Sequence, residues 1–335
     1  MQKITYLLGA GASCHALPVV EKIPERLKDF ILQLESKELQ PPVEGYYSDI
    51  DVSGLAEPIS EYYKKMINSL HWLYKASIKH SSIDTFAKKL FLIGDNPCLA
   101  ELKIGLSLFF AYEQINNLPD PRYDSFFASI LDHSLKLPER VKILTWNYDS
   151  QIEISYSGFS GQEDIALCSK QLGVYTKSDN NPPGTPSVFK INGTTAFRPR
   201  KENYHKLFLT KRRERIDLEL SQTFTRDYAE AACAPSEQLL SFAWEPEVAN
   251  NLLVKINESV KETDVLVIIG YSFPYFNREI DRQIIVSMYQ LKKVYIQYPY
   301  ASDILERFES VKPNLTGLKL VPVIHTKQFL LPNEL

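Results

Sequence analysis

Six short apolar runs stand out along the chain, and each has the composition of a buried β-strand. They are rich in Val and Ile and contain few charged residues. The runs cover Ile4–Leu8, Val141–Trp146, Ser187–Ile191, Val265–Ile269, Val294–Tyr298 and Leu318–Ile324. Short runs that are apolar throughout, without alternation, are typical of central strands covered on both faces. We therefore predict a sheet that is buried on both sides.

Helix-type spacing of apolar residues fills much of the chain between these runs. The first predicted helix starts at Pro24 and places Leu27, Phe30, Ile31 and Leu34 on one face. Further helices are predicted over 56–75, 84–93, 99–117, 122–135, 213–229, 246–262 and 277–290. Strands separated by helices favour an α/β fold with a doubly wound, mostly parallel, Rossmann-like sheet.

The spacing of the strands indicates a large insertion. After the first strand, no convincing partner appears until Val141, so residues 21–138 are predicted to form a mostly helical insertion within a single domain of residues 1–335. A dehydrogenase-type βαβ unit would return to the sheet within about 30 residues, which argues against hydride transfer. Residues 40–54 and 180–184 are predicted to be loops. The apolar tail Phe329–Pro332 is expected to dock on the body of the protein or on a neighbouring subunit.

Composition narrows the possible partners. The chain of 335 residues is 44% hydrophobic and carries a formal net charge of -3. A packed core is therefore expected, and direct binding of nucleic acid is not. The densest basic run, Lys211–Arg215, is followed by acidic residues, and we interpret it as a solvated helix face in preference to a phosphate-binding patch. No apolar span is long enough to cross a membrane, so no membrane association and a cytoplasmic location are expected.

The four cysteines argue against a zinc module. They stand at positions 14, 98, 168 and 233, with no Cys-x-x-Cys pair among them. This spacing provides neither a tetrathiolate zinc ribbon nor a disulfide framework, so we expect no zinc and a reducing compartment.

The first predicted strand runs directly into a glycine turn, Gly9-Ala10-Gly11-Ala12-Ser13. Its two glycines would let the backbone approach a pyrophosphate, and successive N–H groups, with the Ser13 hydroxyl, could donate to phosphate oxygens. The turn lacks the third glycine and the later acidic residue of the usual dinucleotide fingerprint. An ordinary tight strand-to-helix turn is therefore the alternative interpretation.

Three more polar segments lie at or just after the ends of predicted strands. They are Thr145-Trp146-Asn147-Tyr148-Asp149, Asn192-Gly193-Thr194-Thr195 and Gly270-Tyr271-Ser272-Phe273-Pro274. Each by itself is also compatible with plain turn chemistry. Open α/β sheets bind ligands at the carboxyl ends of their strands, so the four turns are expected to meet at one edge and enclose a dinucleotide.

Together these segments resemble the sirtuin-like NAD-binding family, and specifically its bacterial branch associated with antiphage defence. Members of that branch hydrolyse NAD and lack the zinc ribbon of protein-deacylating sirtuins. Gly9–Ser13 is similar to the family's Gly-Ala-Gly-x-Ser loop, Thr145–Asp149 to its Thr-x-Asn-x-Asp segment, and Gly270–Ser272 to its late glycine-serine turn. The resemblance runs from Ile4 to about Val323 and implies a sheet of the sirtuin type.

The resemblance also implies roles for individual residues, with NAD as substrate. The implied NAD-binding residues are Gly9, Ala10, Gly11, Ala12, Ser13, Thr145, Trp146, Gly193, Gly270, Tyr271 and Ser272. Asn147 would hold the ribose or the attacking water, and Asp149 would stabilise positive charge or accept a proton. For Asp149 the alternative is a structural role as the cap of the following helix. Trp146 and Tyr148 could stack on nicotinamide or adenine, or belong to the core.

The chain departs from the family at one catalytic position. Lys190-Ile191-Asn192-Gly193 stands where the family has Lys-x-His-Gly, so Asn192 replaces the catalytic histidine. Histidine can act as a base, whereas a carboxamide can only position and donate. Losing a general base typically lowers a rate by about 10²- to 10⁴-fold. Asn192 would orient a ribose hydroxyl, and His205 could supply a replacement base or simply lie on the surface.

The leading functional hypothesis is an NAD glycohydrolase that releases nicotinamide and ADP-ribose and depletes NAD during antiphage abortive infection. The same resemblance implies a homo-oligomer and a separate sensing or ATPase partner. The alternative is a catalytically weak sensor or scaffold subunit that binds NAD or ADP-ribose. A nucleotide-processing enzyme of another type on the same sheet is a third hypothesis.

Overall fold

A computed structural model describes residues 1–36, 57–177, 186–198, 206–208, 217–233, 237–242, 244–245, 252–312, 314 and 316–335. The chain divides into two compact units. The first, which we call the sheet unit, comprises Met1–His15, Pro119–Thr194 and Ser241–Leu335; the second unit comprises Ala16–Leu118 and Thr195–Leu240. Four sequence predictions fall outside the described residues: the loops at 40–54 and 180–184, the basic run Lys211–Arg215, and His205.

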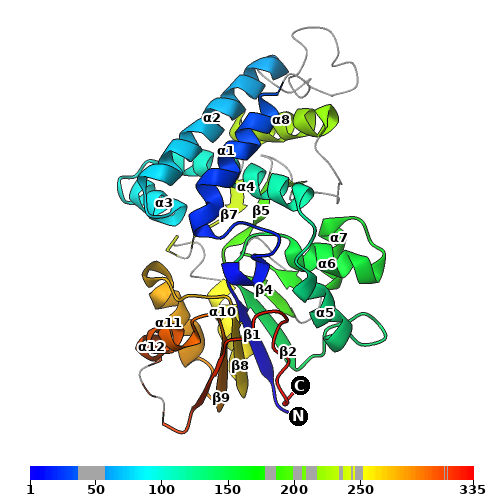
Figure 1. The fold of residues 1–335 in the computed structure, drawn as a ribbon, viewed down its shortest axis with the longest axis vertical. Helices are drawn as coiled ribbons and strands as arrows, with labels where there is room; N and C mark the ends of the chain where they lie inside the picture. The colour runs from blue at the N-terminus through cyan, green and yellow to red at the C-terminus, as the bar shows by residue number, and fades with distance from the viewer. Residues whose placement is uncertain are drawn as a thin grey trace. The chain divides into compact units, whose positions relative to one another are not determined.

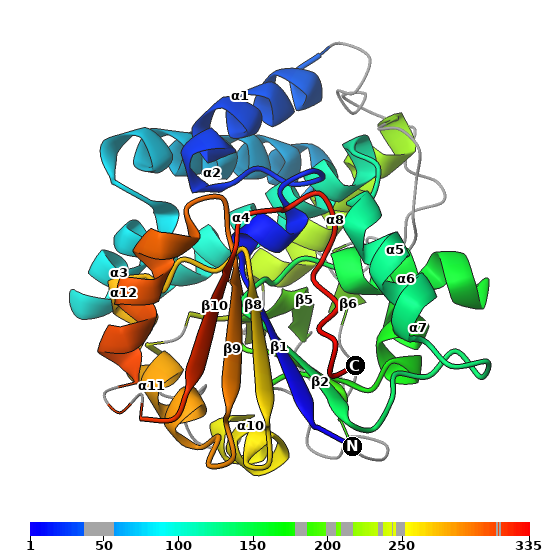
Figure 2. The same cartoon turned by 60° about the horizontal axis from the view of Figure 1, so that its bottom comes forward.

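The sheet unit is built on a seven-stranded parallel sheet with the order β10-β9-β8-β1-β2-β4-β3. The strands are β1 Ile4–Leu8, β2 Val141–Thr145, β3 Val174–Tyr175, β4 Val188–Lys190, β8 Val265–Ile269, β9 Lys293–Gln297 and β10 Lys319–Val323. Figure 2 shows β10, β9, β8, β1 and β2 side by side. The six strands predicted from the sequence are confirmed, and the edge strand β3 was not anticipated.

Side chains of the strands alternate between two cores on opposite faces of the sheet. In β1, Ile4, Tyr6 and Leu8 face one core and Leu7 faces the other. The helices that contribute to the first core are α5 Pro121–Ile130, α6 Gln151–Ser160 and α7 Ile165–Gln171; those of the second are α10 Leu252–Val260, α11 Arg278–Val286 and α12 Ala301–Val311. Because helices cover both faces, the strands are apolar on both sides. The sheet unit is therefore a Rossmann-like, doubly wound α/β fold.

Two predicted helices end early: the one expected over 277–290 stops at Val286, and the one expected over 122–135 has an end with a local cause. The helix expected over 122–135 stops at Ile130. Just beyond it, the Asp132 carboxylate accepts the N–H groups of Ser134 and Lys136, and Leu135 has a φ of 59°. A side chain that bonds nearby backbone N–H groups stabilises a turn in place of a helix. The prediction was therefore wrong for residues 131–135.

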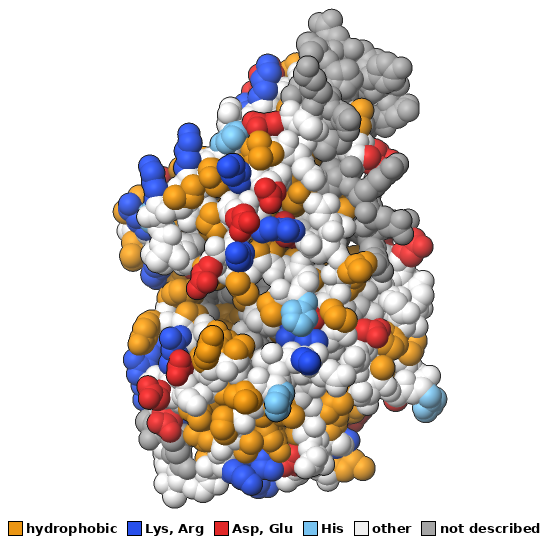
Figure 3. Space-filling model, viewed as in Figure 1, with side chains coloured by type: hydrophobic (Ala, Val, Ile, Leu, Met, Phe, Trp, Pro, Cys, Tyr) orange, Lys and Arg blue, Asp and Glu red, His pale blue; other side chains and the backbone are white. Residues whose placement is uncertain are grey.

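The second unit is mostly helical. It contains α1 Ile23–Leu34, α2 Ile59–Lys79, α3 Ile83–Leu92, α4 Asn96–Asn116, α8 Leu218–Cys233 and most of a small sheet of β6 Lys206–Leu207, β5 Gly193–Arg198 and β7 Glu237–Leu240; the first two residues of β5 belong to the sheet unit. Most of α4 is buried, and its Tyr112 stacks on Phe30 of α1 with ring centroids 4.2 Å apart. Acidic and basic side chains are interspersed over the described surface of these helices in Figure 3. The helices between β1 and β2 are thus shared: α1–α4 belong to the second unit and α5 to the sheet unit.

The C-terminal segment docks on the sheet unit. Phe329 is buried and makes edge contacts with Tyr123 and Phe126 of α5, with ring centroids 4.9 and 5.9 Å apart. The predicted docking on the body of the protein is thus confirmed for Phe329. Within the described ranges, no helix is both long and apolar enough to span a membrane.

Candidate functional site

The candidate site lies at the carboxyl ends of four neighbouring strands. From β1 the chain builds one half of the sheet through β2 and β4, and it then returns to β8 on the other side of β1. Open α/β sheets bind ligands where the strand order reverses in this way. The four polar turns begin at the ends of β8, β1, β2 and β4, which are adjacent in that order. The structure therefore gathers the turns at one edge of the sheet unit.

Hydrogen bonds link each turn to its neighbour. They run from Gly11 N to Gly270 O at 2.9 Å, from Asn147 Nδ2 to Gly9 O at 3.0 Å, and from Asn192 Nδ2 to Trp146 O at 2.9 Å. Two of the three donors are side chains that the sequence analysis named as catalytic candidates. The four turns therefore form one connected polar structure.

The glycines of the first and last turns are required by their mutual packing. A Cβ on Gly9 would lie 2.7 Å from the Cα of Tyr271, and a Cβ on Gly11 would lie 2.7 Å from the Cα of Gly270. Gly270 has a φ of +62°, and its Cβ would lie 2.4 Å from the carbonyl carbon of Gly11. Cβ atoms essentially never approach other heavy atoms under 3.0 Å. The sequence suggested that these glycines let the backbone approach a pyrophosphate. In the structure they let the turns after β1 and β8 approach each other.

Ser13 and Thr145 hold Asn147 in place. Ser13 ends the short 3-10 helix Ala10–Ser13 and is buried; its Oγ accepts from Asn147 Nδ2 at 3.2 Å and lies 3.4 Å from the Tyr123 hydroxyl. Thr145 Oγ1 accepts the backbone N–H of Asn147 at 3.0 Å. Within the described residues, both side-chain hydrogen bonds of Asn147 use Nδ2. The Oδ1 atom is thus left to accept a hydrogen bond from a ligand.

Asp149 belongs to a buried group of charges. Its Oδ1 accepts the N–H of Gln151, the first residue of α6, at 3.0 Å. Lys190 Nζ donates to the backbone oxygen of Asp149 at 2.6 Å and pairs with Glu153 Oε1, also at 2.6 Å. Burial raises the pKa of Asp149, and the hydrogen bond from Gln151 N–H and the charge of Lys190 offset this only in part. The helix-capping role considered for Asp149 is the one that its hydrogen bond to α6 shows.

Asn192 carries an unpaired oxygen atom in a buried position. The residue is 8% exposed, and its Nδ2 group donates a hydrogen bond to the carbonyl oxygen of Trp146. Its Oδ1 atom is buried and has no hydrogen-bond partner among the described residues. An unsatisfied buried polar atom typically costs about 1–3 kcal/mol, and a bound donor such as a ribose hydroxyl would remove that cost.

Trp146 and Tyr271 face each other in the core. Each is 4% exposed, and their rings stack with centroids 5.7 Å apart and 13° between the planes. Trp146 Nε1 and the Tyr271 hydroxyl both donate to the carboxylate of Asp281 in α11, at 3.2 and 2.8 Å. The core interpretation of Trp146 is therefore the one that this structure shows. Tyr148 and Ser272 are half-buried.

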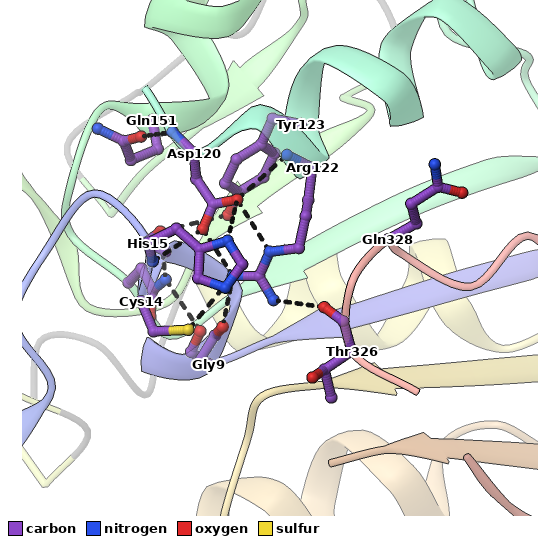
Figure 4. Close-up of polar contacts among 12 residues, drawn as sticks. Gly9, Cys14, His15, Asp120, Arg122, Tyr123, Gln151, Thr326 and Gln328 are labelled. Carbon is purple, nitrogen blue, oxygen red and sulfur yellow. Dashed lines mark hydrogen bonds and ion pairs between the residues drawn. The ribbon is translucent and has the colours of Figure 1, made fainter. Parts of the chain in front are cut away.

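Sequence reasoning missed a buried ion pair that holds the end of the first turn. The Arg122 guanidinium donates to Asp120 at 2.8 and 2.6 Å (Figure 4), and it also donates to Gly11 O at 2.8 Å. Asp120 Oδ2 accepts the backbone N–H of His15 at 3.1 Å, and Arg122 also donates to Thr326 O at 3.3 Å. Asp120 before a proline is a recognisable helix start. No local signal indicates that the Arg122 side chain reaches a turn more than a hundred residues away.

The comparisons with known proteins add no family assignment. No protein-family model matches the chain, and no curated protein is significantly similar to it. The resemblance to sirtuin-like proteins thus depends on the four motifs and on where their strands lie. In the part of the chain that the structure describes, no three His, Cys, Asp or Glu side chains are grouped so that they could hold a metal ion.

Proposed function

We propose that this protein is an NAD glycohydrolase that cleaves the nicotinamide–ribose bond to give nicotinamide and ADP-ribose. The observation that carries the proposal is the buried Oδ1 of Asn192, which has no partner among the described residues, at the sheet edge where Asn147 also has an Oδ1 to offer. Two amide oxygens in the turns after adjacent strands are suited to accept hydrogen bonds from the hydroxyls of a ribose or from an attacking water. The reversal of strand order at β1 is the usual place for a dinucleotide in this class of fold.

The chemistry of this substrate tolerates a site without a strong base. The bond to nicotinamide joins a ribose to a cationic pyridinium, so its cleavage expels a neutral group and leaves positive charge on the sugar. Oriented dipoles that meet developing charge are often the largest single contribution to catalysis. In this proposal Asn147 orients water or the ribose, Asn192 orients a ribose hydroxyl, and Asp149 contributes a nearby carboxylate.

The biological setting is proposed from the resemblance alone. An enzyme of this kind would deplete NAD as the effector of antiphage abortive infection, acting in the cytoplasm. It would be active as a homo-oligomer and would be controlled by a separate sensing or ATPase partner.

The activity is tested by incubating the purified protein with NAD and following nicotinamide release by chromatography. We expect turnover by the wild type and a loss of about 10²-fold or more in Asn147→Ala, because the variant lacks the oxygen that orients the reactants. The matched control is Asn257→Ala in α10, another carboxamide of the sheet unit, outside the four turns. Unchanged turnover in Asn147→Ala would contradict the assignment.

A second function is favoured by one observation, the carboxamide at position 192. A carboxamide is not a base, so the protein could bind NAD or ADP-ribose as a sensor or scaffold subunit without turning it over. Calorimetry with ADP-ribose, measured beside the nicotinamide assay, separates the two functions. Binding without nicotinamide release, with the self-associated and partner-bound states also tested, would favour the sensor.

A further inference from the structure

Asp281 joins two of the four turns although it belongs to neither. It lies in α11, is 1% exposed, and accepts hydrogen bonds from Trp146 Nε1 at its Oδ1 and from the Tyr271 hydroxyl at its Oδ2. Trp146 belongs to the turn after β2 and directly precedes Asn147. Tyr271 belongs to the turn after β8 and directly precedes Ser272. One carboxylate is thus bonded to both turns.

These bonds bear on the backbone of the candidate site. The N–H of Trp146 donates to Leu8 O at 3.0 Å, and its carbonyl oxygen receives the Asn192 side chain. A movement of the Trp146 ring would therefore move the backbone oxygen that holds Asn192 and the peptide that leads directly into Asn147. On the other side, a Cβ on Gly9 would touch Tyr271, so the turn after β8 also fixes the first turn.

The turn after β8 needs support from outside itself. Phe273 has a φ of 51°, an unfavourable conformation for a residue that is not glycine. Its ring packs on Tyr271 at 4.8 Å, and Asn277 Nδ2 donates to the Tyr271 hydroxyl at 3.1 Å. Strained backbone persists only where surrounding contacts hold it. Among those contacts is the hydrogen bond from Tyr271 to Asp281.

We propose that Asp281 is a positioning residue of the candidate site. Its carboxylate holds the turns after β2 and β8 in one arrangement, and the affinity of the site for a nucleotide is higher when Asp281 is ionised. The proposal rests on the proposed binding of NAD at this edge. In the ionised form both carboxylate oxygens accept, one from each ring. In the protonated form one oxygen carries a proton. When Asp281 donates this proton to the Tyr271 hydroxyl, Asp281 no longer accepts the hydrogen bond that the hydroxyl donates in the ionised form. The ionised form therefore holds the two turns together more firmly.

The surroundings of Asp281 favour a change of ionisation near neutral pH. Burial raises its pKa to about 8, and the hydrogen bonds from Tyr271 and Trp146 lower it only in part. Among the described helices, η3 Tyr275–Asn277, α10 and α12 pack most closely against α11. The charged side chains of α10, α11 and α12 have no part in this shift: Lys255, Glu258, Arg278, Glu279, Arg282, Asp303, Glu306, Arg307 and Glu309. Among the described residues, Tyr271 is thus the titratable group that faces Asp281.

The test compares the wild type with Asp281→Asn, which keeps an oxygen for Trp146 and offers an amide donor to the Tyr271 hydroxyl, as the protonated acid would. ADP-ribose is the probe, because it is not consumed. By calorimetry we expect the wild type to bind ADP-ribose about 5-fold or more tightly at pH 9 than at pH 6.5. We expect Asp281→Asn to match the wild type at pH 6.5 and to show no change with pH. Other ionisable groups near the edge, including His15 and Cys14, are the same in both proteins.

Tryptophan fluorescence measured without ligand tests the hydrogen bonds of Asp281 separately from nucleotide binding. The tryptophan emission of the free wild type should change with a midpoint near pH 8, since a carboxylate beside the Trp146 indole gains or loses its charge there. Asp281→Asn should lack this change. Emission that is constant with pH, or a change that persists in Asp281→Asn, would overturn the proposal, as would a variant whose affinity keeps the wild-type pH dependence. If emission titrates as expected but ADP-ribose and NAD bind at neither pH, the proposed function fails, and the hydrogen bonds of Asp281 do not position a nucleotide site.

Discussion

Asn147 and Asn192 are both carboxamides at the same sheet edge, but the structure prepares them differently. Asn147 is half-buried, and its amide group is fixed by Gly9 and Ser13. Asn192 is almost wholly buried, and in the part of the chain that the structure describes its side chain is bonded only through Nδ2, so its Oδ1 atom remains an acceptor without a partner there. A histidine at position 192 could keep the bond to Trp146 O through one ring N–H and present its other nitrogen as a base.

This difference predicts the effect of restoring the family's residue. If the proposed enzyme lacks its base, Asn192→His should raise the rate of nicotinamide release by about 10-fold or more, since a general base contributes about 10²- to 10⁴-fold. The rate is measured under the same activating conditions as the wild type, with Asn192→Ala as control for loss of the amide. A fall in rate in Asn192→His would mean that the amide oxygen has a specialised positioning role.

At the residue scale the sequence identified Asn147 and Asn192 as candidate site residues, but it did not identify the groups that they contact. The turns could be found because each follows an apolar strand, and parallel strands bring their carboxyl ends to one edge. Asp281 and Arg122 could not be found, because each reaches the site from a helix through contacts with residues distant in the sequence. Such contacts depend on packing between elements, which no local pattern specifies.

The strands, as elements, were predictable because burial on both faces leaves a continuous apolar run. Helix α12 carries a different but equally readable signal, because its buried Ile304, Phe308 and Val311 recur at helical spacing, although this helix was not predicted. Helix α6 does not: its segment, Gln151–Ser160, combines β-branched, aromatic, serine and glycine residues of modest helix propensity. Its stability therefore depends on packing against the sheet and on the carboxylate of Asp149 at its start.

Two glycines in the sheet unit give a matched test of the turn geometry. Gly270→Ala should lower the free energy of unfolding by about 2 kcal/mol or more, because it combines a positive φ with a Cβ 2.4 Å from Gly11. A Cβ at Gly158 in α6 would meet no described atom within 4 Å outside its chain neighbours and its own helix backbone, so Gly158→Ala should raise that free energy by about 0.5–1 kcal/mol. Urea denaturation followed by circular dichroism measures both. Equal stability of the two variants would mean that the turns after β1 and β8 do not pack as described.

At the scale of the whole molecule, the sheet unit is assembled from three separate stretches of chain and fastened by its last residues. The Gln297 side chain bonds the backbone of His325, Gln328 and Leu330. The backbone oxygen of Gln297 accepts the N–H of Gly270 at 3.1 Å. The C-terminal segment is thereby linked to the turn after β8, and through Arg122 to the turn after β1.

Removing the anchor of this segment should loosen the sheet unit and leave the second unit unchanged. Phe329 is 6% exposed and lies 5.0 Å from the Arg122 guanidinium, so Phe329→Ala should lower the stability of the sheet unit by about 3–5 kcal/mol. Leu331→Ala, two residues on and 37% exposed, should change it by about 0.5 kcal/mol or less. Hydrogen exchange read by mass spectrometry should then show faster exchange in β1, β2 and the turns after them, with α1–α4 unaffected, because cooperative units open independently. If protection fell equally in α1–α4, the two units would unfold as one, and the C-terminal segment would stabilise the whole chain instead of the sheet unit.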